Sequence, residues 1–248
     1  MTDGRRTVRL AAMGDIHCAR DSAGTLRGLF AQAAEAADVL VLCGDLTDYG
    51  LVEEAEILAA ELTAAGETPI VAVLGNHDHE SGDPDGVVRV LAGAGVRMLD
   101  GDAHEVAGVG FAGVKGFGGG FGAGALGHWG EEANKRFVQE ALDEALKLES
   151  ALARLKTDAR VALMHYSPIR ETVENEPPEI FPFLGSSRLE EPLTRYPVSA
   201  VFHGHAHKGT PEGKTAAGVP VYNVSIPLLR ATHPDRAPFR VVELAVTA

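Results

Sequence analysis

Five short stretches of the sequence place Asp, Asn or His immediately after an apolar run. They are Asp15-Ile16-His17, Gly44-Asp45-Leu46-Thr47-Asp48, Gly75-Asn76-His77-Asp78, the lone His165, and Gly204-His205-Ala206-His207. Carboxylate oxygens and imidazole nitrogens together bind divalent metal ions such as zinc, manganese and iron. The set holds more ligands than one ion needs, which indicates a centre of two ions bridged by one acid.

Each stretch taken alone has an ordinary explanation, because Asp is a common N-cap where a strand turns into a helix. The recurrence behind five apolar runs is what favours a shared site. Two polar residues beside these ligands are expected to have structural roles. Asp78 is expected to be a hydrogen-bond partner within its turn, and His203 a buried histidine bonded to backbone.

The apolar runs predict strands whose ends position these side chains. They cover Val8–Met13, Val39–Cys43, Ile70–Leu74, Arg160–Met164 and Val198–Phe202. Helical patterns separate the first three, from Ser22 to about Ala37 and from Val52 to Ala65, and a third helix begins after Asp83. This β-α-β order predicts an α/β fold with parallel strands, and sites in such sheets form beyond the carboxyl ends of the strands.

The second half of the chain is less regular. An antiparallel meander is expected over Val96–Leu99, Ala103–Val106 and Val109–Val114, and a long helix from Glu131 to about Leu155. Gly116–Gly130 has too many glycines for a regular element and is expected to form a mobile or wrapping loop. The proline-rich segment Arg170–Pro197 is expected to be irregular. Val219–Val224 and Phe239–Val246 are predicted to be strands.

Composition narrows the classes of function. The 248 residues suit a single domain over 1–248, and the formal net charge of -13 argues against a nucleic acid partner. No stretch reaches the ~18 apolar residues that cross a bilayer, and Met1–Arg9 is polar, so we expect no membrane association and a cytoplasmic location. Cys18 and Cys43 are expected to be reduced there. The sequence carries no signal for an oligomeric state.

The order and spacing of the motifs resemble the calcineurin-like metallophosphoesterase family. The motifs are Asp-x-His, Gly-Asp-x-x-Asp, Gly-Asn-His-Asp, a lone His and Gly-His-x-His. Gaps of 26 residues separate His17 from Gly44 and Asp48 from Gly75. The resemblance spans Asp15 to His207. It implies a four-layer α-β-β-α sandwich of two stacked mixed β-sheets flanked by helices.

The resemblance also implies a role for each motif residue. Asp45 would bridge the two metal ions, and a hydroxide between the ions would attack phosphorus. His77 would be the general acid, held from behind by the carboxylate of Asp48. Manganese, iron or zinc is the expected metal, with cobalt or nickel as alternatives. One ion would be bound by Asp15, His17, Asp45 and His207, and the other by Asp45, Asn76, His165 and His205.

The resemblance implies a phosphoesterase, but the motifs do not indicate which phosphoester is its substrate. We expect a small phosphodiester or nucleotide-like substrate, with a phosphomonoester as the alternative. A different class, a protein-binding scaffold without catalysis, also occurs on this fold. Arg20, His79 and His128 are candidate substrate contacts. Gly116–Gly130 and Arg170–Pro197 are expected to set specificity, because loops between core strands commonly carry it.

Overall fold

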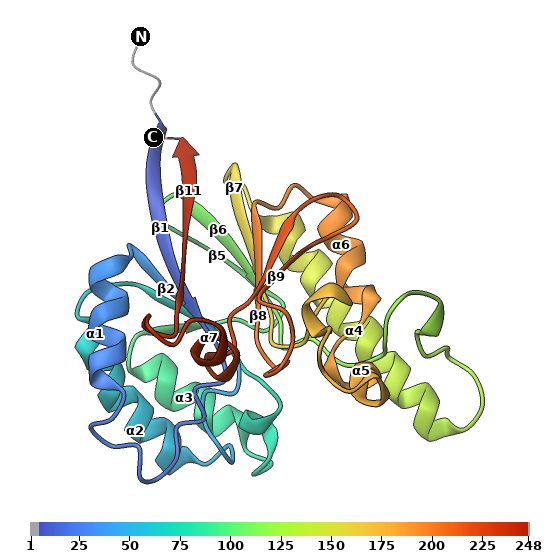
Figure 1. The fold of residues 1–248 in the computed structure, drawn as a ribbon, viewed down its shortest axis with the longest axis horizontal. Helices are drawn as coiled ribbons and strands as arrows, with labels where there is room; N and C mark the ends of the chain where they lie inside the picture. The colour runs from blue at the N-terminus through green and yellow to red at the C-terminus, as the bar shows by residue number, and fades with distance from the viewer. Residues whose placement is uncertain (1–4, 248) are drawn as a thin grey trace.

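The computed structural model describes residues 5–247 (Figure 1). The single domain expected over 1–248 also includes Met1–Gly4 and Ala248, which lie outside the described residues. Within 5–247 the strands form a five-stranded sheet, in the order β11-β1-β2-β3-β4, and a six-stranded sheet, in the order β5-β6-β7-β8-β10-β9. The first sheet comprises β1 Arg5–Met13, β2 Val39–Cys43, β3 Ile70–Val73, β4 Val96–Met98 and β11 Arg240–Thr247. The second comprises β5 Asp102–Val106, β6 Val109–Gly113, β7 Ala159–Leu163, β8 Ala200–His203, β9 Glu212–Lys214 and β10 Pro220–Asn223.

Both sheets are mixed. Strands β1 to β4 run parallel, with Leu10 opposite Val39 and Leu40 opposite Ile70, and β11 pairs antiparallel with β1. In the second sheet β6, β7, β8 and β10 are parallel, while β5 and β9 pair antiparallel at its two edges. The carboxyl ends of the parallel strands therefore lie on one edge of each sheet.

Helices cover the outer face of each sheet, and the two inner faces pack together (Figure 1). The alternation within β2 shows why: Val39, Val41 and Cys43 lie between the sheets, whereas Leu40 and Leu42 face helices. A strand buried on both faces needs an unbroken apolar run. The expected four-layer sandwich is confirmed. The α-helices are α1 Arg27–Ala36, α2 Val52–Leu62, α3 Pro84–Gly93, α4 Glu132–Arg154, α5 Phe181–Leu184, α6 Glu190–Arg195 and α7 Ile226–Thr232. The 3-10 turns are η1 Thr63–Ala65, η2 His77–His79, η3 Gly122–Gly124, η4 Glu171–Val173, η5 Pro178–Ile180 and η6 Ser187–Leu189.

Three elements differ from the sequence predictions. The antiparallel meander over 96–114 is wrong, because β4 pairs parallel with β3 in the first sheet while β5 and β6 form a hairpin in the second. Helix α1 begins at Arg27 rather than near Ser22, because the Glu61 carboxylate accepts the N–H groups of Gly24, Leu26 and Arg27. The proline-rich segment 170–197 folds into short helices of three to six residues.

Strand β9 and helix α7 were not predicted from the sequence. Residue Ser225, just before α7, bridges to Gly14 at the end of β1. Among the helices of residues 5–247, none combines the length and the apolar character needed to cross a bilayer.

Candidate metal centre

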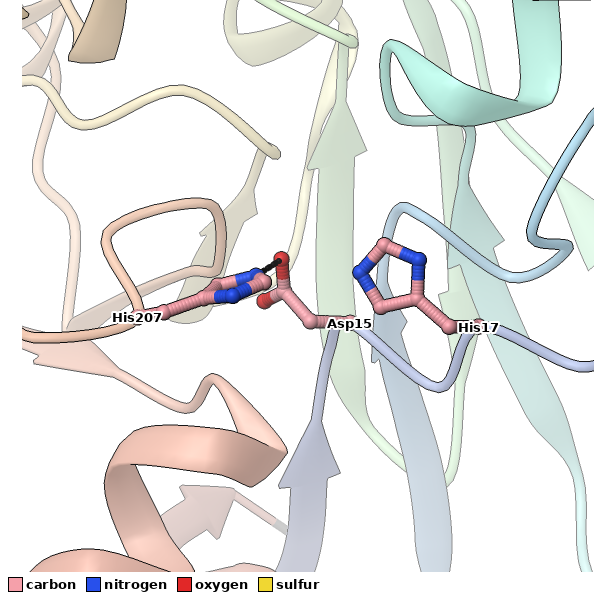
Figure 2. Close-up of side chains that lie close together, drawn as sticks. All are labelled: Asp15, His17 and His207. Carbon is pink, nitrogen blue, oxygen red and sulfur yellow. Dashed lines mark hydrogen bonds and ion pairs between the residues drawn. The ribbon is translucent and has the colours of Figure 1, made fainter.

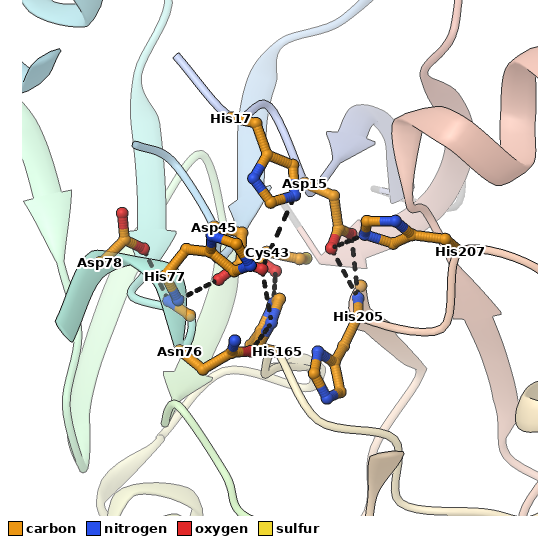
Figure 3. A network of polar contacts seen from close by, with 12 residues as sticks. Asp15, His17, Cys43, Asp45, Asn76, His77, Asp78, His165, His205 and His207 are labelled. Atoms are coloured by element: carbon orange, nitrogen blue, oxygen red, sulfur yellow. Dashed lines mark hydrogen bonds and ion pairs between the residues drawn. The ribbon is translucent and has the colours of Figure 1, made fainter. Parts of the chain in front are cut away.

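The ends of β1, β2, β3, β7 and β8 converge and bring the proposed ligands together (Figure 3). Three groups of side chains each place their potential ligand atoms within 4.8 Å of one another. These groups are Asp15, His17 and His207; His17, Asp45 and His77; and Asp45, His165 and His205. Asn76 joins the third group through its Oδ1, which lies 2.9 Å from His165 Nε2. All seven predicted ligands and His77 thus lie in one cluster.

Asp15 lies between His17 and His207 (Figure 2). Its Oδ1 is 2.8 Å from His207 Nε2, and the His205 backbone N–H donates to both carboxylate oxygens at 2.9 and 3.0 Å. These contacts fix a carboxylate that is only 2% exposed. The motif after β8 is therefore tied directly to the motif after β1.

Asp45 belongs to two of the three groups, as expected of a bridging acid. Its Oδ2 is 3.3 Å from His165 Nε2 and 3.8 Å from His17 Nε2, while its Oδ1 accepts the His77 backbone N–H at 2.8 Å. The side chain is almost fully buried. A carboxylate in this position lies between the ligand sets proposed for the two ions.

The donor set fits divalent metal ions. His17 Nε2 is buried and has no hydrogen-bond partner among residues 5–247, although an unpaired buried nitrogen is costly. It faces Asp45, where a metal ion would satisfy its lone pair. His165 Nδ1 is 2.9 Å from the Cys43 carbonyl oxygen, which orients the ring so that Nε2 points at Asp45 and Asn76. Carbonyls and carboxylates commonly hold metal-binding histidines in this way.

The structure places Asp48 differently from the sequence-based expectation. The Asp48 carboxylate lies behind His17, with Oδ1 3.2 Å from His17 Nδ1. His77 instead bonds the backbone of the same residue, because its Nδ1 lies 2.7 Å from the Asp48 carbonyl oxygen. The expected contact between the Asp48 carboxylate and His77 is therefore wrong. One residue orients both imidazoles, one through its side chain and the other through its peptide group.

The charges within the cluster shift several pKa values. Burial opposes a proton on His165, but the charge of Asp45 outweighs it and raises the pKa of His165 to about 9. Burial likewise opposes charge on Asp45, yet His165 lowers the pKa of this carboxyl. Burial lowers the pKa of His205 to about 4, so that this imidazole is neutral. Metal binding by His165 Nε2 requires loss of its proton.

The backbone carries strain where these ligands lie. Among the described residues six non-glycine residues have positive φ, and four of them are Asp15, His17, Asp45 and His205, at 56°, 47°, 47° and 70°. Each such conformation costs about 1–3 kcal/mol and is typical of functional sites. Gly44, with φ of 79°, passes so close to His165 that an added Cβ would lie 2.6 Å from its ring. The glycine before Asp45 thus lets β2 and β7 end side by side.

Asp78 and His203 have the structural roles expected of them. The Asp78 carboxylate is fully buried and accepts the N–H of Gly75 at 2.7 Å and that of Thr47 at 2.8 Å. It therefore ties the turn after β3 to the turn after β2. His203 is buried, with Nδ1 2.8 Å from the Gly204 carbonyl oxygen and Nε2 2.8 Å from Thr172 Oγ1.

The three predicted substrate contacts lie apart from the cluster. Arg20 is exposed and pairs with Glu53 at 2.9 Å. His79 borders a separate cavity that Lys115 and Glu144 also line. His128 is exposed in the part of the glycine-rich loop that projects beside α4 (Figure 1). The His79 backbone N–H donates to the Asn76 carbonyl oxygen at 3.1 Å. Within residues 5–247, the side chains of all three residues make no hydrogen bond or ion pair with the predicted ligands.

A groove beside the cluster was missed by the sequence reasoning. It has a volume of about 380 Å³, and both Asn76 and His205 line it. Four aromatic rings line its walls: Phe117, Phe137, Tyr166 and Phe183. We call this cavity the aromatic groove. Phe117 comes from the glycine-rich loop and Phe183 from the proline-rich segment. The sequence does contain phenylalanines in both of the segments expected to set specificity, and these could have indicated an aromatic groove.

The same fold occurs in solved structures. Phosphopantetheinyl hydrolase (PptH) from Mycobacterium tuberculosis aligns with a TM-score of 0.67 and 15% identity, over 94% of this chain and 95% of that one. TT1561 of Thermus thermophilus aligns with a TM-score of 0.56 and 15% identity, over 96% and 99%. GAP50, the anchor in the inner membrane complex of Plasmodium, aligns with a TM-score of 0.56 and 14% identity, over 89% and 72%. At such identities the likeness shows the fold alone.

The sequence itself identifies the family. No curated protein sequence matches the chain. The family model described as calcineurin-like phosphoesterase matches residues 8–209, which include every strand-end motif of the cluster. The chain therefore belongs to the calcineurin-like phosphoesterase family.

Proposed function

We propose that this protein hydrolyses a small phosphoester at a centre of two divalent metal ions, most readily a phosphodiester or nucleotide-like substrate. One observation carries the proposal. Asp45 lies between two histidine groups, and one of those histidines, His17, turns an unpaired buried nitrogen towards it. An unpaired buried nitrogen is costly in a purely structural ion-pair network, whereas a metal ion would satisfy it.

The three residue groups support the ligand roles that the family resemblance implies. Asp15, His17, Asp45 and His207 would bind one ion. Asp45, Asn76, His165 and His205 would bind the other, so that Asp45 is shared. Manganese, iron and zinc suit this oxygen and nitrogen donor set, and cobalt or nickel also fits it. Two such ions lower the pKa of a bound water and polarise the phosphoryl oxygens of a substrate.

His77 is the proposed general acid. Its Nδ1–H donates to the Asp48 carbonyl oxygen, so that Nε2 of the doubly protonated imidazolium would give a proton to the leaving oxygen. The ring also packs edge-on against His17, with centroids 4.6 Å apart. His77 is therefore held in one orientation beside the proposed ligands, as proton transfer requires.

A phosphomonoester is the second candidate substrate. The cluster recognises only the phosphate, and both ester classes present the same phosphoryl oxygens to it. The aromatic groove favours a substrate with an apolar or aromatic substituent, and either ester class can carry one.

A non-catalytic scaffold is the alternative from a different class. GAP50 is described as an anchor, so this fold alone does not imply catalysis. The scaffold accounts less well for the unpaired His17 nitrogen and for the strained backbone at Asp15 and Asp45.

The test is an activity panel on metal-reconstituted protein. Purified protein is stripped with a chelator, reloaded with Mn²⁺, Fe²⁺ or Zn²⁺, and assayed on nitrophenyl phosphate esters and diesters and on cyclic nucleotides. Hydrolysis should depend on added metal and should be lost in Asn76→Ala and His165→Ala. Full activity in either variant would exclude the proposed centre, and binding of two ions without any hydrolysis would favour the scaffold.

A further inference from the structure

The rings of the aromatic groove form a series of contacts that begins at His205 of the candidate metal centre. The His205 and Tyr166 ring centroids are 4.5 Å apart, and Tyr166 lies 5.8 Å from Phe117. Phe117 lies 4.8 Å from Phe137, which lies 6.0 Å from Phe183. Successive rings within these distances are in contact. A substituent on a phosphate bound at the centre would therefore meet rings on its way out.

The rim of this groove exposes apolar surface to water. Phe183 is 59% exposed and Ile180 is 38% exposed, and both border the groove. Among the described residues that line it there is no Asp, Glu, Lys or Arg. Exposed apolar surface of this kind beside a polar site is typical of a ligand-binding groove. The groove can therefore hold an apolar group but gives little hydrogen-bond readout.

The groove is preformed by backbone contacts between its two walls. Gly119 N–H donates to the Pro182 carbonyl oxygen at 2.6 Å, and Gly120 N–H donates to the Gly185 carbonyl oxygen at 2.9 Å. An added Cβ at Gly118 would collide with the same Pro182 oxygen. The close approach of these segments fixes Phe117 and Phe183 relative to each other, so little conformational entropy is lost when a ligand binds.

Phe183 also connects the groove to the cluster. Its carbonyl oxygen lies 3.0 Å from His205 Nε2. His205 Nδ1 is therefore the nitrogen that would bind a metal ion together with Asp45 and His165. The residue whose ring forms the outer wall of the groove thus orients a proposed metal ligand through its peptide group. The groove and the centre form one continuous site.

We propose that the aromatic groove binds a flat aromatic group of the substrate, an aryl group or a nucleobase, while the phosphate lies at the metal centre. This inference rests on the proposed function and narrows its substrate class. Rings stack on any flat aromatic group, because each has a π-face, and a lining with few polar groups does not select among bases. The substrate is therefore recognised by shape rather than by hydrogen bonds.

The test compares three phosphonates, whose C–P bond is not an ester and is not hydrolysed. Calorimetry measures binding of phenyl-, cyclohexyl- and methylphosphonate to the Mn²⁺-loaded protein. We expect phenylphosphonate to bind at least tenfold more tightly than methylphosphonate, and more tightly than cyclohexylphosphonate. Phe183→Ala should reduce the phenyl-to-methyl ratio about tenfold, which corresponds to ~1.4 kcal/mol. Because the Phe183 side chain is largely exposed, we expect Phe183→Ala to fold normally.

The matched control is Leu146→Ala, which removes a side chain of 60% exposure on the outer side of α4 and should leave the ratio unchanged. Equal affinities for the three phosphonates would overturn the aromatic assignment while the phosphate site stands. Equal affinities for phenyl and cyclohexyl would show an apolar rather than a flat site and also overturn it. A preference for phenylphosphonate that persists in both Phe183→Ala and Phe117→Leu would show that the phenyl ring binds outside the aromatic groove and would overturn the proposal. Failure of every phosphonate to bind would refute the proposed function together with this inference.

Discussion

Asp48→Asn separates the two contacts that this residue makes. The substitution keeps the shape of the side chain but removes the negative charge behind His17, whose Nδ1 is 3.2 Å from Asp48 Oδ1. The bond from His77 Nδ1 to the Asp48 carbonyl oxygen belongs to the backbone and is retained. The expected defect is therefore weaker metal binding at the His17 position, with proton donation by His77 intact.

The size of the effect follows from the contact and its exposure. Loss of a residue that orients a metal-binding histidine typically lowers metal affinity about 10–100-fold, or ~1.4–2.8 kcal/mol. The Asp48 side chain is 30% exposed and that of His17 is 22% exposed, so solvent screens part of the charge. We therefore expect a loss near the lower end, about tenfold, at one of the two ion positions.

The assay combines metal titration with a series of leaving groups. Calorimetry of metal-free protein should show one weakened ion position in Asp48→Asn. Hydrolysis at limiting metal should fall by a similar factor for nitrophenyl and alkyl esters and recover at saturating metal. Asp38→Asn is the control, since Asp38 pairs with Arg9 just before β2, at the opposite end of the strand from the cluster. Unchanged metal affinity together with a loss of hydrolysis rate on alkyl esters alone would refute this reasoning. That result would indicate that the Asp48 carboxylate assists His77 instead of His17.

Three further predictions concern the bridge, the pH dependence of stability and a helix end. Asp45→Asn should release both ions on dialysis, as measured by elemental analysis, because its carboxylate faces both histidine groups; two retained ions with a normal rate would exclude the bridge. Burial lowers the pKa of His203 to about 4 from the ordinary 6.5, so the unfolded chain binds a proton that the folded chain excludes. His203 should therefore contribute a fall of up to about 3 kcal/mol in the free energy of unfolding between pH 6.5 and 4, in urea titrations with chelator present, and His203→Gln should remove this contribution while that of His205 remains. Glu61→Gln should lower the free energy of unfolding by about 1–2 kcal/mol, because its carboxylate accepts three N–H groups at the start of α1, whereas exposed Glu56→Gln should not; equal urea midpoints would contradict this.

The sequence was sufficient where burial demands a pattern. The run Val39–Cys43 lies between the second sheet and the outer helices, so that both of its faces must be apolar and its bounds are readable from composition. The polar residue that follows such a run lies at the sheet edge, which is why the motif residues from Asp15 to His207 could be collected into one cluster. Their roles as ligands stay predictions until metal binding is measured.

The sequence was insufficient where position depends on contacts between distant irregular segments. β4 and β5 are short, and a short apolar run does not indicate which sheet it joins, so a meander was expected where the chain crosses between sheets. The aromatic groove arises because Gly118 allows the Pro182 carbonyl to approach, a contact that no periodicity encodes. Phe117 and Phe183 are 66 positions apart in the numbering, and both of their rings contact the ring of Phe137.

Asp48 shows the same limit at the scale of one turn. Spacing from Asp45 places Asp48 in the turn after β2, but two imidazoles lie within reach, and spacing does not choose between them. The choice is made by Asp78, which accepts the N–H groups of Leu46 and Thr47 and so fixes the turn. With the turn fixed, the Asp48 peptide faces His77 and its carboxylate faces His17. Weakening the anchor through Asp78→Asn should therefore disturb both histidines at once, whereas Asp48→Asn should disturb His17 alone. Loss of metal affinity and of leaving-group assistance together in the first variant, but not in the second, would establish that order of dependence.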